Sequence, residues 1–338
     1  MKTVLLAIAV FFLTQAEAQR ISPLKNIVFE GAGIRGIAYC GVIKSLQENN
    51  LIDSLQRIGG TSAGAILAMM LTLNYSSAEI EHIISNTSFS SFNDGKFGII
   101  GGFARLKRFY GWYRGRKIEK LISNLIEEKT GDAHMTFNQL HEHGFKDLYI
   151  TGTNLTQQKV VVFSRENYPE MEIRDAIRIS MSIPLYFQAV FLEGSRVQRR
   201  PGDKSEVYVD GGFVANFPIR IFDSTRYVNT ADTNAFGVNK ETIGFRIDSG
   251  SQIENDKQQK GLAPQQIRNI REYITAFYTI VLENLNRQTL TVQDWKRTVS
   301  IDDGNLGPRI KKLTRAETKR LVLNGYSATQ QFLKNYAE

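Results

Sequence analysis

Cysteine and histidine are the scarcest reactive residues in this sequence. The one cysteine, Cys40, cannot form an internal disulfide, so the stability of the fold must come from packing. No set of histidine, cysteine and acidic residues shows the spacing of a metal site, so the sequence predicts neither a metal nor an organic cofactor. The four histidines all lie in polar stretches of the first half of the chain: His82, His134, His141 and His143. The closely spaced His141 and His143 are interpreted as solvated surface.

Long apolar runs are also scarce. The run Val4–Leu13 is about half of the roughly 20 residues that a membrane-spanning helix needs. Lys2 precedes it, and Ala16-Glu17-Ala18 follows with the small-x-small pattern that signal peptidase cuts. Residues 1–18 are therefore predicted to be a signal peptide. Export would take the mature chain to the periplasm, the extracellular medium or the outer-membrane surface.

Acidic residues are outnumbered, with 34 Asp and Glu against 42 Lys and Arg, and the net charge is +8. Cleavage after Ala18 would leave this charge unchanged, because Lys2 and Glu17 are removed together. A basic surface favours anionic partners such as lipid headgroups or nucleic acid. The predicted export and the lack of a recognisable binding motif argue against nucleic acid.

Interdomain linkers are missing as well, because no stretch is rich in proline or serine. The 42% of hydrophobic residues can build a sizeable core. We therefore expect one domain over residues 19–338, with a core at about 26–217 and a C-terminal helical part at about 261–338. The sequence does not predict an oligomeric state.

Strand and helix patterns alternate along the chain. Apolar runs predict strands at residues 25–30, 55–59, 147–151, 159–163, 206–209 and 242–247, and helical spacing predicts helices at 37–48, 63–73, 118–128, 173–180 and 263–285. Thr314 and Glu317 form a capping-box pattern at the start of the last helix. The polar stretch 229–260, around the strand at 242–247, is the most loop-like. This alternation predicts an α/β fold with a mostly parallel central sheet covered by helices on both faces.

The segment Gly60-Thr61-Ser62-Ala63-Gly64 lies between a predicted strand and a predicted helix. A G-x-S-x-G sequence in that place is typical of a nucleophile elbow, where small neighbours leave room for a sharp turn. The positive end of the helix would favour the serine alkoxide and the oxyanion that follows. By itself the pattern is equally consistent with a tight turn capped by Ser62.

A second glycine-rich turn, Gly31-Ala32-Gly33-Ile34-Arg35-Gly36, also joins a predicted strand to a helix. Small residues there let backbone N–H groups point at an anion. One interpretation is a dinucleotide-binding turn, because Asp53 lies roughly 20 residues further on. Asp53 follows polar residues, however, and does not end an apolar strand. The other interpretation is an oxyanion hole that serves Ser62.

Asp210 follows the predicted strand 206–209 and precedes Gly211 and Gly212. An acid in this place can serve a site at the edge of a sheet, or it can form a local turn. A hydrolase with the chain order Ser, Asp, His needs a histidine after the acid, and none follows His143. A triad of that order is excluded if Asp210 is the acid, whereas a Ser62–Asp210 dyad is allowed.

In this order, GAGIRG, GTSAG and DGGFVANFP resemble the motifs of the patatin-like phospholipase family. The segments 179–187 (ISMSIPLYF) and 323–329 (LNGYSAT) are similar to further parts of that family. The resemblance covers about 26–217 and resumes near residue 321. Glu30 and Ala32 depart from it, since many members have Asp and Gly there; the change at Ala32 matters little if the donors are backbone groups.

The resemblance implies a three-layer α/β fold and a dyad in which Ser62 is the nucleophile and Asp210 is its base. It also implies supporting roles for the glycines of the elbow and of the acid loop, which are Gly60, Gly64, Gly211 and Gly212. The implied oxyanion loop consists of Gly31, Ala32, Gly33, Ile34, Arg35 and Gly36. Arg35 would either fix this loop or approach an anionic headgroup.

The implied activity is that of an exported serine acyl-ester hydrolase of the phospholipase or lipid-esterase type. Its substrate would be a phospholipid or another acyl ester. Two alternatives stay open: a catalytically silent lipid-binding relative, and a nucleotide-dependent enzyme that uses the glycine loop. The aromatic and basic stretch 92–116 suits peripheral contact with a membrane, or an ordinary loop packed over the sheet.

Overall fold

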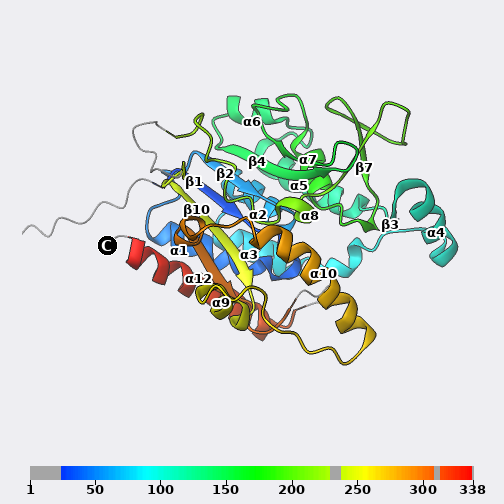
Figure 1. Cartoon of the computed structure of the whole chain (residues 1–338). Helices are drawn as coiled ribbons and strands as arrows, with labels where there is room; N and C mark the ends of the chain where they lie inside the picture. The colour runs from blue at the N-terminus through cyan, green and yellow to red at the C-terminus, as the bar shows by residue number, and fades with distance from the viewer. Residues whose placement is uncertain (1–23, 229–236, 308–312, 337–338) are drawn as a thin grey trace, which may run out of the picture.

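The computed structural model describes residues 24–228, 237–307 and 313–336 (Figure 1). The predicted signal peptide, residues 1–18, lies outside the described residues. A nine-stranded sheet forms the centre of the molecule, in the order β11-β10-β1-β2-β4-β9-β7-β8, with β5 paired to β4. Its strands are β1 (Asn26–Phe29), β2 (Arg57–Gly60), β4 (Asp147–Asn154), β5 (Lys159–Phe163), β7 (Val190–Glu193), β8 (Arg196–Gln198), β9 (Glu206–Asp210), β10 (Thr242–Asp248) and β11 (Thr298–Asp302).

Parallel pairs make up the middle of this sheet, where β11, β10, β1, β2 and β4 all run in one direction. Antiparallel pairs extend it beyond β4, because β5 and β9 pair antiparallel to β4 and β7 pairs antiparallel to β9. A separate two-stranded sheet consists of β3 (Gly111–Tyr113) and β6 (Leu185–Phe187). The predicted α/β class with a mostly parallel central sheet is confirmed.

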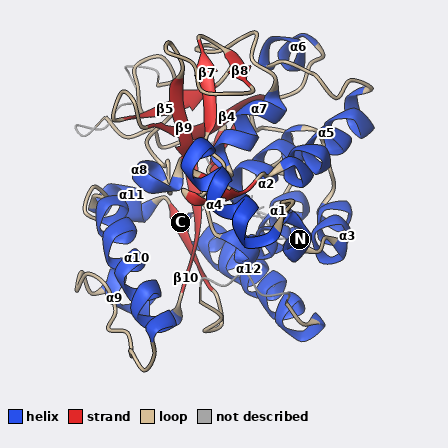
Figure 2. Ribbon diagram, turned by 90° about the vertical axis from the view of Figure 1, so that its right-hand side faces the viewer, coloured by secondary structure: helices blue, strands red, loops and turns tan. Residues whose placement is uncertain are grey.

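Helices cover both faces of the sheet (Figure 2). The helices on the first face and around it are α1 (Tyr39–Glu48), α2 (Ala63–Thr72), α3 (Ser77–Asn86), α5 (Arg116–Thr130), α6 (Phe137–Glu142), α7 (Ile173–Ser180) and α12 (Arg315–Tyr336). The helices beside the second face and at its margin are α8 (Gly212–Ala215), α9 (Gly250–Lys257), α10 (Ile270–Arg287) and α11 (Val292–Lys296). The remaining ones are η1 (Gly33–Ala38), η2 (Phe89–Phe92) and α4 (Gly98–Phe109).

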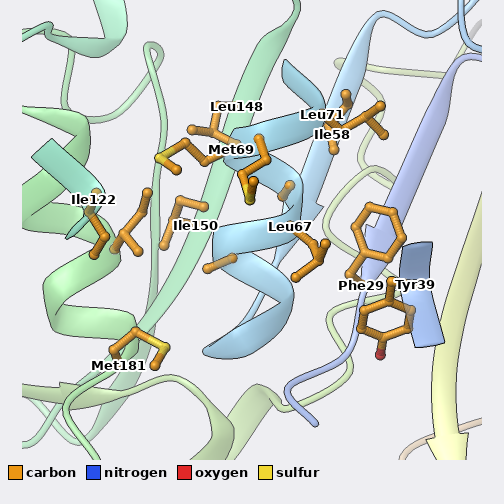
Figure 3. Packing of buried hydrophobic residues seen from close by; sticks show 14 of the residues in the cluster. Phe29, Tyr39, Ile58, Leu67, Met69, Leu71, Ile122, Leu148, Ile150 and Met181 are labelled. Atoms are coloured by element: carbon orange, nitrogen blue, oxygen red, sulfur yellow. The ribbon is translucent and has the colours of Figure 1, made fainter. Parts of the chain in front are cut away.

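The core lies mainly between the first face and its helices. Alternate residues of a strand point to opposite faces, so Ile27 and Phe29 of β1 join the large cluster while Val28 joins a smaller one. Figure 3 shows Leu67 of α2 near Phe29, and Met69 of α2 beside Leu148 of β4. On the second face, Val28 packs in a cluster with the segment after α8, which supplies Phe217, Ile219 and Phe222. This packing holds β1, β2 and β4 side by side.

The C-terminal helix crosses α1 at very short range. A Cβ on Gly41 would lie 1.9 Å from the Val322 carbonyl oxygen, and one on Gly325 would lie 2.0 Å from the Ala38 carbonyl oxygen. Only glycine allows such an approach of two backbones. The predicted capping box is present, because the Thr314 amide donates to Glu317 and the Glu317 amide donates to the Thr314 hydroxyl.

Most predicted elements are present within one or two residues of their expected ends, and two expectations were wrong. The helix expected at 263–285 begins at Ile270, because the Asn269 side chain accepts the Glu272 amide and caps the helix there. The stretch expected to be loop-like contains α9, which the Ser249 hydroxyl caps by accepting the Gln252 amide. Residues 229–236 of that stretch lie outside the described part of the chain. Several elements had not been predicted, among them α3, α4, the β7–β8 hairpin and β11.

Candidate active site

Ser62 stands at the junction of β2 and α2, where the chain turns sharply. Its φ of 52° and ψ of −121° are a backbone conformation that residues other than glycine rarely adopt. The Ser62 amide donates to the hydroxyl of Ser180, at 2.8 Å, and this bond holds the turn from the side of α7. A strained serine fixed by its surroundings is what a nucleophile elbow requires.

The glycines around Ser62 lie against other parts of the backbone. A Cβ on Gly60 would lie 2.3 Å from the Gly64 carbonyl oxygen, and one on Gly64 would lie 2.4 Å from the Phe29 carbonyl oxygen. Real Cβ atoms do not come so close to backbone atoms, so the turn excludes side chains at both places. The spacing of the G-x-S-x-G sequence therefore has a steric cause in this fold.

Asp210 ends β9, whose neighbour β4 lies next to β2 in the sheet. The Ser62 Oγ donates to Asp210 Oδ2 at 2.8 Å, and the Gly212 amide donates to Asp210 Oδ1 at 2.7 Å. Both carboxylate oxygens are thus held, and the Asp210 amide donates to the carbonyl oxygen of Ser182. A Cβ on Gly211 would lie 2.6 Å from the Thr151 carbonyl oxygen, so this turn also requires glycine.

Burial shapes the acid–base behaviour of Asp210. Burial raises the pKa of Asp210 to about 7, while the hydrogen bonds from the Gly212 amide and the Ser62 hydroxyl oppose the rise. A carboxylate with a pKa near neutrality is a stronger base than an exposed aspartate and is still deprotonated at pH 8. The side chain can therefore accept a proton from the hydroxyl that it contacts.

The glycine-rich turn lies directly against the elbow. Parallel pairing of β1 with β2 brings Gly31 beside Ser62, and a Cβ on Gly31 would lie 3.2 Å from Ser62 Cβ. Gly36 faces Ala63, since its Cβ would lie 3.4 Å from that of Ala63. Within the described chain, the amides of Ala32, Gly33 and Ile34 donate to no protein acceptor, whereas the Arg35 amide donates to the Ala32 carbonyl oxygen.

Gly33 is the outermost residue of this turn. It is exposed and has a φ of +54°. Its amide and those of its two neighbours thus have no acceptor among the described residues and can donate to a group from outside the protein. The Ala63 amide at the start of α2 donates to no acceptor among the described residues either, and it follows the serine directly. The sequence analysis assigns Ala63 no donor role, although the residue after an elbow serine commonly supplies such a donor.

The Arg35 side chain has partners within the protein. Its guanidinium forms an ion pair with the buried carboxylate of Asp303, at 3.1 Å, and a long hydrogen bond to the Ala32 carbonyl oxygen. Of the two roles expected for Arg35, this geometry favours fixing the loop over approaching a headgroup. Asp303 lies just beyond β11, outside every motif that the sequence suggested.

Asn216 connects the acid segment to the glycine loop. The Gly31 amide donates to the Asn216 carbonyl oxygen, and the Asn216 side chain donates to the Gly31 carbonyl oxygen. Asn286 of α10 then accepts the Asn216 amide at 2.6 Å and donates to the Gly212 carbonyl oxygen at 3.4 Å. Nothing local marks Asn286 in the sequence, because its role depends on where α10 packs.

Glu30, directly before the glycine loop, belongs to a buried charge cluster. Its carboxylate accepts the Ile247 amide at 3.0 Å and pairs with Arg246 at 3.1 Å. Burial raises the pKa of Glu30 to about 7, and the charge of Arg246 opposes the rise. Arg246 also pairs with Asp248, so the end of β10 and the start of the loop are tied together.

Residues that sequence reasoning connected to other functions lie elsewhere. All four histidines are exposed, and each forms a hydrogen bond with a residue outside the three motifs. Asp53 is in an exposed turn before β2, and the end of β2 carries Ser62, so the acid-ended second strand of a dinucleotide site is not formed there. In the described part of the chain, no three His, Cys, Asp or Glu side chains group as they would to hold a metal.

Comparison with known proteins places this geometry in a family context. A family model described as patatin-like phospholipase matches residues 27–223, more than half of the chain. Protein R571 of Acanthamoeba polyphaga mimivirus is 32% identical over 204 residues, which are 60% of this chain and 62% of that protein. The probable lipid hydrolase 463L of Invertebrate iridescent virus 6 is 26% identical over 198 residues, which are 58% of this chain and 62% of that protein.

The chain thus spans about three fifths of the length of these two relatives. Among solved structures, VipD from Legionella pneumophila superimposes with a TM-score of 0.56 over 93% of this chain and 67% of its own. At 16% identity this likeness concerns the fold alone.

Proposed function

The chain belongs to the patatin-like phospholipase family, and from this membership and the site geometry we propose that it is an exported acyl-ester hydrolase acting on lipids. Ser62 is the proposed nucleophile and Asp210 its base. The observation that carries the proposal is the 2.8 Å hydrogen bond from Ser62 Oγ to Asp210 Oδ2 at a strained turn. The proposed exporting segment is residues 1–18, and residues 19–338 are proposed to form one hydrolase domain, since β10 pairs with β1 although it lies beyond the family match.

In the proposed reaction, Asp210 takes the proton of the Ser62 hydroxyl as Oγ forms a bond to the acyl carbonyl carbon. The carbonyl oxygen becomes an oxyanion, and the proposed donors that stabilise it are the amides of Ala32, Gly33, Ile34 and Ala63, which have no acceptor among the described residues. Collapse of this intermediate breaks the ester bond, and Asp210 returns its proton to the departing alcohol. An acyl-serine remains.

Hydrolysis of the acyl-serine repeats these steps with water. Asp210 accepts a proton from the water as its oxygen attacks the acyl carbon, and Ser62 leaves with that proton. The product is a free fatty acid. The proposed substrate is a phospholipid or a related acyl ester, and since such lipids are organised in membranes, the proposal includes peripheral contact with a lipid surface.

Turnover of a panel of fluorogenic acyl esters tests this proposal. Ser62→Ala and Asp210→Asn should each lower turnover by at least about 10³-fold and leave the circular dichroism spectrum unchanged. Single alanine variants at the four histidines serve as controls and should keep wild-type turnover, because all four are exposed. Comparable activity in Ser62→Ala and wild type would overturn the nucleophile assignment.

One alternative is distinguished in the same assay. A catalytically silent relative would bind lipid and show no turnover that depends on Ser62 with any ester of the panel.

A histidine variant as inactive as Ser62→Ala, with an intact fold, would overturn the dyad.

A further inference from the structure

Helix α4 presents apolar side chains to solvent. Phe97 is 83% exposed, Ile99 70%, Ile100 83% and Phe103 61%, and together they form what we call the apolar tip. A surface helix ordinarily turns such residues inward and polar ones outward. Figure 1 shows α4 at the margin of the molecule, away from the central sheet, and Figure 2 shows it facing the viewer.

The helix is held in this orientation by specific contacts on its other side. A Cβ on Gly102 would lie 2.4 Å from the Trp112 ring, so the helix rests closely on that ring. Arg105 is buried, and its guanidinium donates to the carbonyl oxygens of Trp112 and Lys96 at 2.7 and 2.8 Å. Since Gly102 and Arg105 occupy the inward face, Ile100 lies on the opposite, outward face, and Ile99 lies at its flank. Phe103 stays 61% exposed while one side of its ring meets Trp112 edge-on, with the ring centroids 5.3 Å apart. The exposure of the apolar tip is therefore built into the packing.

The chain around the apolar tip is rich in cations. Between Gly95 and Ile118 there are seven Lys and Arg residues and no Asp or Glu. The acids Asp94 and Glu119 flank this stretch, and the Asp94 carboxylate accepts the Gly115, Arg116 and Lys117 amides. Arg105 is buried. The other six cations form no ion pair with any carboxylate of the described residues; they are Lys96, Lys107, Arg108, Arg114, Arg116 and Lys117.

Lys107 and Arg108 are exposed in the last turn of α4, about 12 Å along the axis from Ile99 and Ile100. An apolar end with cations one headgroup layer behind it matches the profile of an anionic membrane surface.

This surface is also linked to the proposed active site. Strand β3 follows α4 and pairs with β6, and the residues just before β6 are Ser182, whose carbonyl oxygen accepts the Asp210 amide, and the exposed Ile183. Buried Arg178 joins the two regions, since it donates to the Ser182 hydroxyl and to the Arg114 carbonyl oxygen at the end of β3. The apolar tip is thus connected to the segment that holds Asp210 through the β3–β6 pairing and the hydrogen bonds of Arg178.

We propose that α4 docks the protein onto membranes rich in anionic phospholipid, with the apolar tip inserted and Lys107 and Arg108 at the headgroups. The proposal rests on the proposed function in taking the membrane as the source of substrate. A second copy of the chain is a poorer occupant, because it would bring the same unpaired cations against themselves. Docking through α4 would turn the β3–β6 sheet, and with it the Ser62 region, toward the lipid.

Sedimentation of the full-length protein with vesicles tests the docking surface. Vesicles of phosphatidylcholine with about one third phosphatidylglycerol should bind the wild type much more tightly than pure phosphatidylcholine vesicles. Ile100→Ser/Phe103→Ser should weaken binding to the anionic vesicles at least about tenfold. Lys107→Ala/Arg108→Ala should weaken it about 30-fold, from roughly fivefold per cation near the surface, and more salt should reduce the difference.

Matched controls lie on α12, away from α4. Leu323 is 58% exposed and Lys319 is exposed, so Leu323→Ser and Lys319→Ala remove similar groups and should leave vesicle binding within twofold of wild type. All variants should keep wild-type turnover of a short, monomeric ester, which reports on Ser62 without a membrane.

The outcomes separate the two proposals. Wild-type vesicle binding by both α4 double variants would overturn the docking surface. So would a wild-type dimer in sedimentation equilibrium that Ile100→Ser/Phe103→Ser converts to monomers, since the apolar tip would then contact protein. Absence of turnover of every ester, with vesicle binding that depends on α4, would instead overturn the proposed hydrolase and leave the docking surface standing.

Discussion

Of the regions that hold non-glycine residues at positive φ, the elbow and helix α4 do so in opposite ways. At the elbow, Ser62 has a φ of 52°, and the neighbouring glycines touch backbone atoms of β1 and α2. At α4, Phe97 and Tyr110 have φ values of 65° and 60° at the two ends of the helix, and the helix is held by its close approach to the Trp112 ring and by the hydrogen bonds of its own Arg105. Ser62, with a ψ of −121°, lies in a region that residues other than glycine rarely occupy, whereas Phe97 and Tyr110, with ψ values of 29° and 22°, lie in the left-handed helical region. The stronger strain is offset by dense backbone packing, and the weaker one by a few side-chain contacts.

This difference determines which residues of the two regions can be substituted. Backbone contacts at the elbow leave no alternative to glycine, because any Cβ would displace a neighbouring element. The outward face of α4 meets solvent, and among its exposed apolar side chains Phe103 also contacts the Trp112 ring, so substitutions there remove at most a surface contact and leave the core unchanged. We expect substitutions at the elbow to affect folding and chemistry, and those on the apolar tip to affect lipid binding alone.

The largest expected effect is on folding and comes from Gly64→Ala. Its Cβ would lie 2.4 Å from the Phe29 carbonyl oxygen and 2.6 Å from that of Glu30. Since β1 and α2 would have to separate, the free energy of unfolding should fall by more than about 3 kcal/mol, as measured by urea denaturation.

Gly98→Ala on α4 is the matched substitution in the second region. Gly98 has a φ of +47° and nothing within 4 Å of its Cβ position, so only backbone strain of about 1 kcal/mol is expected. Equal losses of stability in the two variants would contradict the contrast between the regions.

A smaller effect, on the chemical step, is expected from Gly33→Val in the glycine loop. Valine is strained at a φ of +54° and should shift the free amides beside Ser62. We expect kcat to fall by roughly 10²-fold with little change in KM, because the lost interaction forms mainly in the transition state.

Gly194→Val tests whether strain alone explains that result. Gly194, in the β7–β8 turn, has a φ of +61° and nothing within 4 Å of its Cβ position. It therefore carries a similar strain and should keep kcat within twofold of wild type. Equal losses of kcat in the two variants would remove the evidence for an oxyanion role of the loop.

The smallest perturbation that distinguishes the two regions is a change of pH, which needs no substitution. Burial raises the pKa of Asp210 to about 7, and only the deprotonated carboxylate can accept the Ser62 proton. Turnover of a soluble ester, expressed as kcat/KM, should therefore fall about tenfold per pH unit below 7 and be constant above it. Vesicle binding through α4 should change less than twofold between pH 6 and 8, because residues 97–108 contain no histidine or acid.

The free energy of unfolding should also depend on the protonation of Asp210. Because the folded-state pKa of Asp210 lies above that of an unfolded aspartate, its charge destabilises the fold above pH 7, and this cost is lost as the pH falls toward 4. Asp210→Asn should accordingly be more stable than wild type at pH 8, by a few kcal/mol, and nearly equal to it at pH 4. Activity that stays level down to pH 5 would show that Asp210 titrates as an ordinary exposed aspartate.

The local sequence pattern was sufficient to predict many of the strands and helices. The sequence predicted strands β5 and β9 and helix α7 almost to the residue, because apolar periodicity and turn residues mark their ends. The helix α10 was predicted seven residues too early, since its start depends on a cap from Asn269. Helix α4 was missed altogether, because its outward face is apolar and its pattern is not that of a packed surface helix.

The sequence by itself determined the three glycine-containing motifs, their order along the chain and the absence of any histidine after Asp210. These are local properties, since small residues at fixed spacing are visible without knowing what they touch. Only the tertiary structure decided that Ser62 meets Asp210 across 148 residues of chain, that Ser180 accepts the Ser62 amide, and that Asn216 and Asn286 link the glycine loop to the acid segment. Those contacts depend on strand order and on helix packing, which arise from the whole buried core and leave no mark in any short stretch of sequence.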